Sequence, residues 1–306
     1  MDENNAKNDI ILNMQTISPR DAYIVSLSKH DRSQNMIDHN LIILNAHFIE
    51  KEMVVNGSDV ASMKFLKPIA NSLLNLLEND VSTDRFAILL ATKLLLTYDP
   101  NDTLGVQEQI PVQFRIECRN IKVGRMLSPK LSYNKKAIKF LFDRHSYRNF
   151  KNEIIDQAVV ESIINVASNT PTACNRQPCR ILYSLTKEGN DLLRKLVPDQ
   201  FVASHIYNFF VITVDRSFFN PGEELQELVN GGIFLESLLL AIHAHGLGAT
   251  AFQTSVFVSQ NRDNLKPYGF NDNELIVATI GYGIPVEKSS VAAAYKRKAR
   301  DISRRI

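Results

Sequence analysis

The sequence predicts an α+β fold, a sheet flanked by helices, which follows a mainly helical N-terminal extension. Residues 60–79 and 84–98 repeat apolar side chains at helical spacing, with the polar stretch NDVSTD between them. From about residue 137 the order becomes a helix, two strands, a long apolar helix and two more strands. We therefore divide the 306 residues into 1–135, a helical extension with a linker, and 136–306, an α+β domain.

Within the extension, residues 1–40 are polar and weakly periodic, which indicates irregular chain. We expect two antiparallel helices with inward stripes at Val60, Met63, Leu66, Ile69, Leu73, Leu74 and Leu77, and at Phe86, Leu89, Leu90, Leu94 and Leu95. The second helix is expected to be capped by Ser82, Thr83 or Asp84. Residues 99–135 carry scattered charge, prolines and glycines, which predicts a linker.

In the α+β domain, residues 154–168 predict a helix capped by Asp156, with Ile155, Val159, Ile163, Val166 and Ala167 facing inward. The stretch from Ile233 to Ile242 is apolar nearly all round, which predicts a helix that is buried on most faces. We expect this helix to be opened by Pro221 and ended by Gly246. The predicted strands, rich in β-branched and aromatic residues, are 179–186, 208–215, 249–254 and 274–283.

Composition limits the class of protein. The chain is 44% hydrophobic and 22% charged, as is typical of a soluble globular protein. The acidic first residues do not resemble a signal peptide, and no apolar run approaches the roughly 20 residues that a membrane span needs. Three cysteines suit a reducing compartment. The net charge of +2 argues neither for nor against nucleic acid. We expect a cytoplasmic protein without membrane or nucleic-acid partners.

The segment DRHSYRNF (143–150) is the first candidate site. Arg144, Ser146 and Arg148 alternate, so their side chains share one face of an extended chain. Two guanidiniums beside a hydroxyl can bind a phosphate, because each guanidinium donates two parallel hydrogen bonds. The alternative is an exposed, charged connection.

The loop NTPTACNRQPCR (169–180) is the second candidate. Pro171 and Pro178 restrict the backbone, while the amides of Asn175 and Gln177 offer donors and acceptors together. That combination suits the edge of a flat heteroaromatic ring. The alternative is a structural loop whose amides satisfy its own backbone.

Several other patterns are set aside. GLGATA (246–251) formally fits the dinucleotide fingerprint, but it follows a helix and leads into a strand, the reverse of the required context. His243 and His245 face different ways on a helix and do not predict a metal site. Cys174 and Cys179 lack the spacing of a zinc ligand pair, and no base is evident that would make Cys179 a nucleophile.

Together these motifs resemble the flavin-dependent nitroreductase family. The resemblance rests on R-x-S-x-R before a helix, P-[ST]-x-x-N-x-Q-P after it, a long helix ending in G-L-G and a late strand ending I-G-Y. It covers roughly residues 137–306 and implies a nitroreductase-like sheet, an obligate homodimer and two FMN sites built from both subunits. It also implies ping-pong transfer of electrons from NAD(P)H through FMN to a small acceptor, such as a nitroaromatic or a quinone.

The resemblance assigns residues to the FMN site by position. It implies that the phosphate and ribityl chain are bound by Arg144, Ser146, Arg148, Arg297 and His145. It implies that the ring is lined by Pro171, Thr172, Ala173, Asn175 and Gln177 of the second subunit, and that Ala251, Phe252, Gln253 and Thr254 pass the flavin N5 edge. No protein residue is expected to act as a catalytic acid or base, since the cofactor carries the hydride chemistry.

The chain departs from the family pattern at positions that bear on the identity of the electron acceptor more than on that of the cofactor. Cys179 follows Gln177-Pro178 where the family commonly has tryptophan, and Thr172 replaces serine. HFIEKEM (47–53) is similar to an H-x-I-E-K-G-L element of nitroreductase-like proteins in polysaccharide biosynthesis clusters, with Glu52 in place of glycine. The alternatives are a flavin-binding assembly or regulatory module without turnover, and a helical scaffold joined to an unrelated α+β domain without cofactor.

Overall fold

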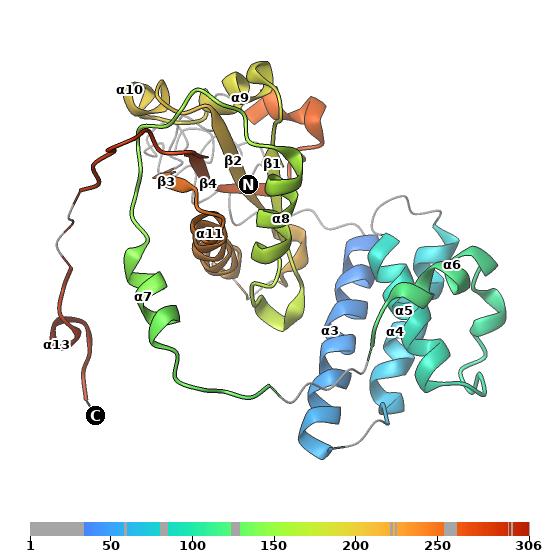
Figure 1. Ribbon diagram of the computed structural model, residues 1–306. Helices are drawn as coiled ribbons and strands as arrows, with labels where there is room; N and C mark the ends of the chain where they lie inside the picture. Colours follow the sequence, from blue (N-terminus) through green and yellow to red (C-terminus); the bar gives the residue numbers. More distant parts are fainter. Residues whose placement is uncertain are drawn as a thin grey trace, which may run out of the picture.

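The computed structural model separates a helical region from an α+β region (Figure 1). It describes residues 34–57, 60–79, 85–123, 129–220, 223, 225–253, 262–292, 294 and 296–305. Each region has its own hydrophobic core: one lies within residues 42–110, and the others lie within residues 150–282. The boundary predicted at residue 135 remains a prediction.

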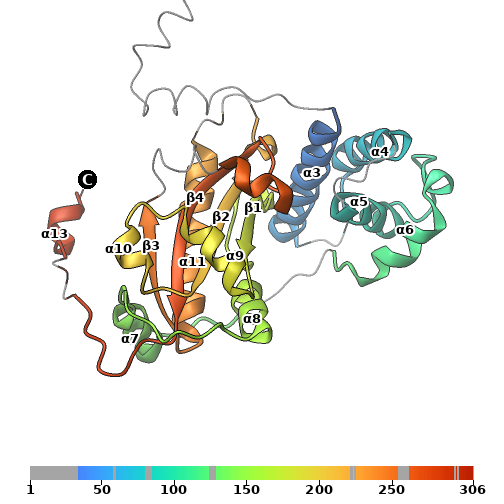
Figure 2. The same cartoon turned by 90° about the horizontal axis from the view of Figure 1, so that it is seen from above.

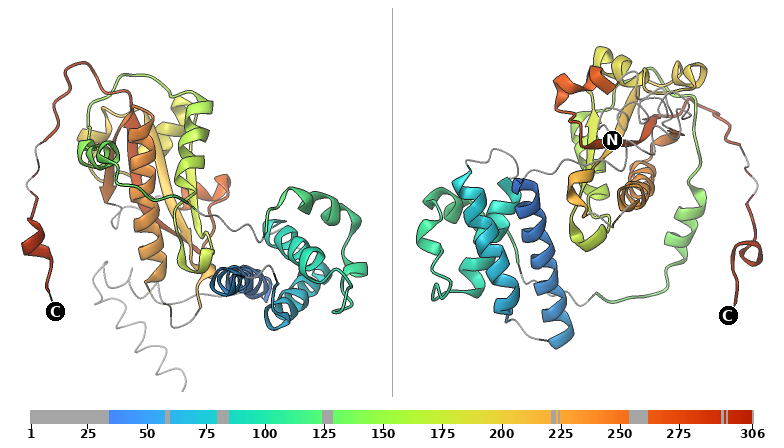
Figure 3. Two further views of the ribbon diagram at one scale, coloured as in Figure 1. Left: turned by 60° about the horizontal axis from the view of Figure 1, so that its bottom comes forward. Right: turned by 180° about the vertical axis from the view of Figure 1, so that it is seen from behind.

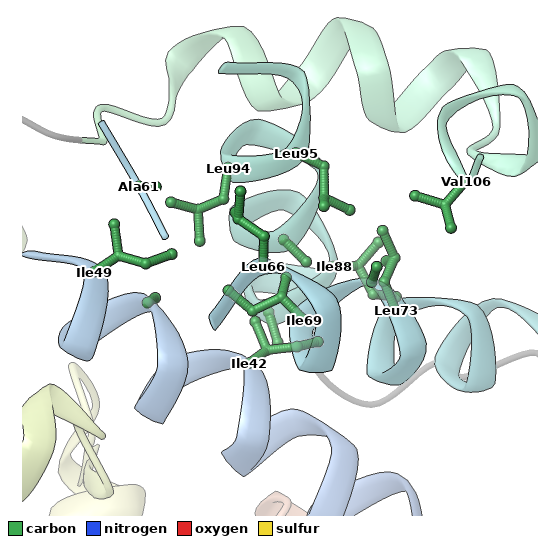
Figure 4. Close-up of a cluster of buried hydrophobic side chains, with 14 of the residues drawn as sticks. Ile42, Ile49, Ala61, Leu66, Ile69, Leu73, Ile88, Leu94, Leu95 and Val106 are labelled. Atoms are coloured by element: carbon green, nitrogen blue, oxygen red, sulfur yellow. The ribbon is translucent and has the colours of Figure 1, made fainter. Parts of the chain in front are cut away.

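The helical region packs three long helices and several short ones around one core (Figure 4). Its elements are α3 (Gln34–Asn56), α4 (Met63–Glu78), α5 (Arg85–Tyr98), η1 (Gln107–Gln109), α6 (Val112–Glu117) and η2 (Cys118–Asn120). Helices α3 and α4 make the largest contact in this region. Leu66, Ile69 and Leu73 of α4 and Leu94 and Leu95 of α5 are buried as predicted.

The helical region differs from the sequence prediction in three respects. Helix α3 begins at Gln34, so residues 34–40, which were expected to be irregular, are helical. Val60, Met63 and Phe86 are exposed rather than inward-facing. The expected linker also begins later than residue 99, because Val106 and Ile110 belong to the helical core and Cys118 is buried. The prolines and glycines of this stretch separate short helices instead of marking unpacked chain. The expected cap at residues 82–84 lies outside the described residues.

Leu66 provides a test of the helical core. The side chain is fully buried, so Leu66→Ala removes apolar contacts and leaves a cavity. We expect the free energy of unfolding to fall by about 2–5 kcal/mol, measured by urea denaturation followed by far-UV circular dichroism. Val55→Ala is the control, because Val55 is 83% exposed on α3 and its truncation is expected to change stability by no more than about 0.5 kcal/mol. An unchanged midpoint for Leu66→Ala would contradict this packing.

The α+β region is built on a four-stranded antiparallel sheet of order β1-β2-β4-β3. The strands are β1 (Cys179–Tyr183), β2 (Asn208–Asp215), β3 (Gly248–Gln253) and β4 (Glu274–Gly283). The remaining elements are α7 (Lys135–Asp143), α8 (Gln157–Ala167), η3 (Ala173–Asn175), α9 (Lys187–Arg194), α10 (Gln200–Ala203), η4 (Arg216–Phe218), α11 (Gln226–Ala244), η5 (Arg262–Tyr268) and α13 (Ala299–Ile302). This arrangement confirms the predicted α+β class.

Helices cover both faces of the sheet (Figure 2). On β2, Phe210 and Ile212 point into the core beneath α8 and α11, while Phe209 and Val211 point into the core beneath α9 and α10. This alternation follows from the two-residue repeat of a strand. The strand is buried on both faces, which explains its nearly unbroken apolar sequence NFFVITVD.

The predicted start of α8, end of α11 and bounds of β4 are confirmed. Asp156 caps α8 by accepting a hydrogen bond from the backbone N–H of Ala158. Gly246 follows α11 with a φ of 73°. Its N–H donates to the carbonyl of His243, and the N–H of Leu247 donates to the carbonyl of Ile242. These two hydrogen bonds form a Schellman motif, which ends the helix. Strand β4 has the predicted bounds.

Two predictions about helix faces are wrong. Val160 rather than Val159 is buried on α8, and Val166 is 50% exposed. Helix α11 begins at Gln226, and its outer face leaves Val229 and Ile233 exposed, so it is not buried on most faces. Pro221 lies outside the described residues. Nearly uniform apolarity cannot distinguish a face that meets the sheet from one that is left open.

Helix α11 is the one helix of the described residues that is long and apolar enough to cross a membrane by length and composition. Within the protein, 44% of that window is buried, and α11 packs against α8 and all four strands of the sheet. A core helix passes the same test of length and apolarity. The expected cytoplasmic location and the absence of a membrane partner remain predictions.

Helix α3 joins the two regions. The Nδ2 of Asn40 donates to the backbone oxygen of Ser217 at 2.6 Å, and this contact is buried. The ring of His39 meets that of Phe218 edge-on at a centroid distance of 4.8 Å. The views agree that α3 lies between the sheet and the other N-terminal helices (Figures 1 and 3). The helical extension therefore packs directly on η4.

Candidate functional site

The phosphate-binding candidate lies beside β3. Arg144 is the C-cap of α7, Ser146 forms a parallel bridge with Ala249, and the N–H of Tyr147 donates to the Ala249 oxygen at 3.0 Å. Tyr147 packs inward against the core, so an extended chain turns Arg144, Ser146 and Arg148 to the opposite face. The backbone thus fixes the alternation predicted from the sequence.

These polar groups are largely uncommitted among the described residues. The nearest acidic partner of Arg144 is Glu236 on α11, at 4.0 Å between Nε and Oε1. Among the described residues, Arg148 donates a hydrogen bond from Nη1 to the carbonyl of Ser146 alone, at 3.4 Å. No hydrogen bond of the Ser146 hydroxyl is found in the described part of the chain. Donors held on one face without internal acceptors fit a phosphate.

His145 is oriented by its own backbone. Its Nδ1 donates to the carbonyl of Asp143 at 2.8 Å, and the ring is exposed. It lies between the two arginines in sequence, but on the other side of the alternating chain. Its predicted contact with the cofactor remains a prediction.

The ring-binding candidate is a loop with an unusual backbone. Cys174, Asn175 and Gln177 have φ values of 51°, 55° and 53°, in the left-handed region that most side chains avoid. Pro171, Asn175 and Gln177 are exposed. The Thr172 hydroxyl instead accepts from the N–H of Gln177 at 3.0 Å, so it serves the loop's own backbone.

The amides of Asn175 and Gln177 are only weakly used inside the loop. The Gln177 Nε2 lies 3.4 Å from both the backbone and the side-chain oxygen of Asn175, a distance at which hydrogen bonds are weak. Both amides therefore retain donors and acceptors on the exposed side of the loop. This arrangement favours the ligand interpretation for the amides and the structural interpretation for Thr172.

Two buried polar residues that the sequence reasoning did not assign hold this loop. Arg176 is 3% exposed, and its Nη1 and Nη2 donate to the carboxylate of Glu223 at 2.7 and 3.0 Å. Asn230 of α11 accepts from the N–H of Ala173 at 2.8 Å. The position of Arg176 inside an amide-rich loop could have indicated a structural role. Its acceptor Glu223, and Asn230, which accepts from Ala173, could be located only from the fold.

The remaining predicted residues are only partly described. Phe252 lies on β3 and packs with Tyr147 against the same core. Gln253 ends β3, while its side chain and all of Thr254 lie outside the described residues. Arg297 is exposed in the C-terminal segment, which stands away from the rest of the subunit (Figures 1 and 2). The predicted role of Arg297 at the phosphate remains a prediction.

The phosphate and ring candidates lie at opposite corners of the sheet. Cys179, next to the loop, pairs with Val214 and through it with Leu275, whereas Gly248, beside Tyr147, pairs with Gly283. β1 and β3 are the two edge strands. At about 4.8 Å between strands and 3.4 Å per residue along them, the two corners lie roughly 30 Å apart. An extended FMN is shorter than this, so one subunit alone cannot present both candidates to it.

Other chemistry is disfavoured by the described residues. Burial raises the pKa of the Cys179 thiol to about 12, which keeps the thiol protonated and unreactive near neutral pH. No group of three or more metal-ligating side chains occurs in the part of the chain that the structure describes.

A cavity of about 550 Å³ adjoins the ring-binding loop, with walls that include Thr172, Gln177 and Cys179.

Structures with similar folds include a proposed nitroreductase from Desulfovibrio desulfuricans in complex with FMN, at 20% identity and a TM-score of 0.48, covering 56% of this chain and 96% of that one. A nitroreductase-like protein from Streptococcus mutans is 14% identical, with a TM-score of 0.49 and coverage of 56% and 98%. A nitroreductase family protein from Clostridium difficile is 17% identical, with a TM-score of 0.46 and coverage of 57% and 98%.

A search of curated proteins found no match. Residues 141–216 match the family model described as the nitroreductase family. This segment runs from the end of α7, through the phosphate candidate and the ring-binding loop, to η4. The match agrees with the family that the motifs of the sequence resemble.

Proposed function

We propose that this chain is an FMN-dependent oxidoreductase of the nitroreductase type, which works as a homodimer with two FMN sites shared between subunits. The observation that carries the proposal is the uncommitted set Arg144, Ser146 and Arg148, held on one face beside β3. Its position inside the family match supports the same assignment.

The phosphate end of the site follows from charge and geometry. Arg144 and Arg148 would bind the dianionic phosphate of FMN with charge-assisted hydrogen bonds, and Ser146 would donate a neutral one. His145 and Arg297 are proposed as additional contacts. For Arg297, the exposed C-terminal segment would have to pack against a second subunit.

The ring end of the site would come from the second subunit. The exposed Pro171, Asn175 and Gln177 would border the isoalloxazine, together with Thr172 and Ala173 of the same loop. The backbone from Ala251 to Thr254 would pass its N5 edge. The separation of about 30 Å between the two corners supports a shared site, because a two-fold axis can bring one subunit's loop to the other's arginines.

An apolar surface formed by α7, α8 and α11 supports the dimer. Exposed apolar side chains on α7, α8 and α11 are Ile138, Leu141, Phe142, Val166, Leu228, Val229 and Ile233. Helix α7 is tied to α11 by the stacking of Phe140 on His243, with centroids 4.7 Å apart. α8 packs along the other side of α11. We call this set the α11 surface, and we propose that it is covered by a second copy of the chain.

Bound FMN would accept a hydride from NAD(P)H and pass electrons to a small acceptor, such as a nitroaromatic or a quinone, in a ping-pong cycle. The protein residues would bind and orient the ring and would supply no obligatory acid or base. Cys179, where the family commonly has tryptophan, leaves a smaller and uncharged side chain beside the cavity of about 550 Å³. This change widens the space available to the acceptor.

The proposal is tested by anaerobic absorption spectroscopy of the protein reconstituted with FMN. We expect NADH or NADPH to bleach the bound flavin bands, and a nitroaromatic or a quinone to restore them. Free FMN at the same concentration is the control for reduction without protein. Bound flavin that no nicotinamide bleaches would support a flavin-binding module without turnover instead. A protein that retains no flavin would exclude both functions.

A further inference from the structure

The ring-binding loop adopts a conformation that its own sequence does not favour. Cys174 and Gln177 take left-handed backbone angles without being glycine, and Asn175 takes them as well. Such angles persist only when the surrounding structure enforces them. The contacts that enforce them therefore decide how the loop presents its exposed side chains.

One of the enforcing contacts is made by Arg176. Its side chain is the one that turns inward between the exposed Asn175 and Gln177, and it is 3% exposed. Both terminal nitrogens of its guanidinium bind the Glu223 carboxylate, at 2.7 and 3.0 Å. The guanidinium also lies 5.7 Å from the ring centroid of Phe219. This geometry needs the planar, two-pronged donor that arginine has and lysine lacks.

The carboxylate that binds Arg176 has a second partner. The Glu223 carboxylate accepts from the N–H of Asn220 at 2.5 Å as well as from Arg176. On the other side of the loop, Asn230 is 1% exposed, accepts from the N–H of Ala173 and donates to the carbonyl of Gln226 at 2.7 Å. The loop is thus fastened at Ala173 and at Arg176, on either side of Cys174 and Asn175.

We propose that the Arg176–Glu223 pair is a positioning device for flavin binding: it fixes the left-handed turn that directs Pro171, Asn175 and Gln177 outward to the isoalloxazine ring. This inference rests on the proposed function, and it assigns Arg176 an indirect role, without contact with FMN. Since the loop faces the ring and not the phosphate, loss of the pair weakens the binding of the ring alone.

The test compares FMN with riboflavin, which carries the same ring without the phosphate. Arg176→Ala is expected to weaken the binding of both flavins by the same factor, at least about tenfold, because a loop without its fixed turn must be ordered when the ring binds. It is also expected to change the visible circular dichroism of the bound flavin. Arg176→Lys, which keeps the charge but not the two-pronged geometry, is expected to show a smaller loss of the same kind.

The matched control is Arg85→Ala. Arg85 also binds a glutamate through two nitrogens, at 2.9 and 2.5 Å from Glu117, but it lies in the helical region far from the loop in sequence. Its replacement is expected to leave flavin affinity and the flavin spectrum unchanged. Exchange of the pair, Arg176→Glu with Glu223→Arg, is expected to recover part of the lost affinity.

The outcomes separate this inference from the proposed function. Wild-type protein that binds no flavin would overturn both. Wild-type protein that binds FMN, with equal affinity and spectrum in Arg176→Ala and Arg176→Lys, would overturn the positioning role alone. Loss of FMN affinity with unchanged riboflavin affinity would also overturn it, because that pattern places Arg176 at the phosphate. If Arg176→Ala does not fold, Arg176→Lys and Glu223→Gln carry the same comparison.

Discussion

Replacing both Arg144 and Arg148 by alanine is expected to weaken FMN binding by at least about a hundredfold. Each arginine would contribute a charge-assisted contact worth roughly 1.5–3 kcal/mol, and 1.4 kcal/mol corresponds to a factor of ten in affinity. In the described chain, Arg144 makes one long ion pair, 4.0 Å from Glu236, and Arg148 makes none, so both guanidiniums can turn to the phosphate. Quenching of FMN fluorescence on titration with protein measures the change.

The control for this prediction separates local contacts from net charge. Arg304→Ala with Arg305→Ala removes the same charge from the exposed C-terminal segment and is expected to leave FMN affinity nearly unchanged. Riboflavin affinity should be similar in the Arg144/Arg148 variant and the wild type, because riboflavin has no phosphate. Full retention of FMN by the double variant would remove the phosphate role from these arginines.

Charging the α11 surface is expected to give a monomer that does not retain FMN. Val229 and Ile233 are 51% and 41% exposed, one helical turn apart on α11. Val229→Glu with Ile233→Glu would bury two carboxylates in the proposed interface, at several kcal/mol each, so the dimer dissociation constant should rise at least about a thousandfold. Light scattering coupled to size-exclusion chromatography gives the mass, and the absorption spectrum of the same peak gives the bound flavin.

Val55→Glu with Val60→Glu is the matched control. Both valines are exposed, at 83% and 74%, but they lie in the helical region and not on the α11 surface. This variant should keep the wild-type mass and flavin content. A dimer that survives the Val229/Ile233 change would move the interface elsewhere. A monomer that still binds FMN with wild-type affinity would contradict the shared site.

The fold was largely predictable because its signals are local or strongly periodic. β4 could be read from its β-branched and aromatic residues, the start of α8 from Asp156, and the end of α11 from Gly246. The short helices between residues 107 and 120 could not be predicted, because each is too short to show a clear helical repeat of apolar residues. Val106, Ile110 and Phe114 do recur every fourth residue and belong to the helical core or pack against it, a signal that prolines and glycines obscured.

The candidate site was less predictable, because its geometry depends on pairs that are distant in the chain. The alternation of Arg144, Ser146 and Arg148 is a local property, and pairing with β3 fixes it. The inward turn of Arg176 depends on Glu223, which lies 47 residues further along the chain. Likewise, the exposed face of α11 cannot be recognised from composition, since the same apolar residues serve a core and an open surface.

The contact of α3 with η4 couples the evolution of two regions that appear separate in the sequence. Phe218 is 3% exposed beneath His39, and the Ser217 carbonyl is paired by Asn40. A chain shortened to its α+β region would expose this aromatic ring and leave that carbonyl to water. Positions 39 and 40 should therefore vary in step with positions 217 and 218 among related proteins, so that exchange of the extension between homologues succeeds only when both sides are transplanted together.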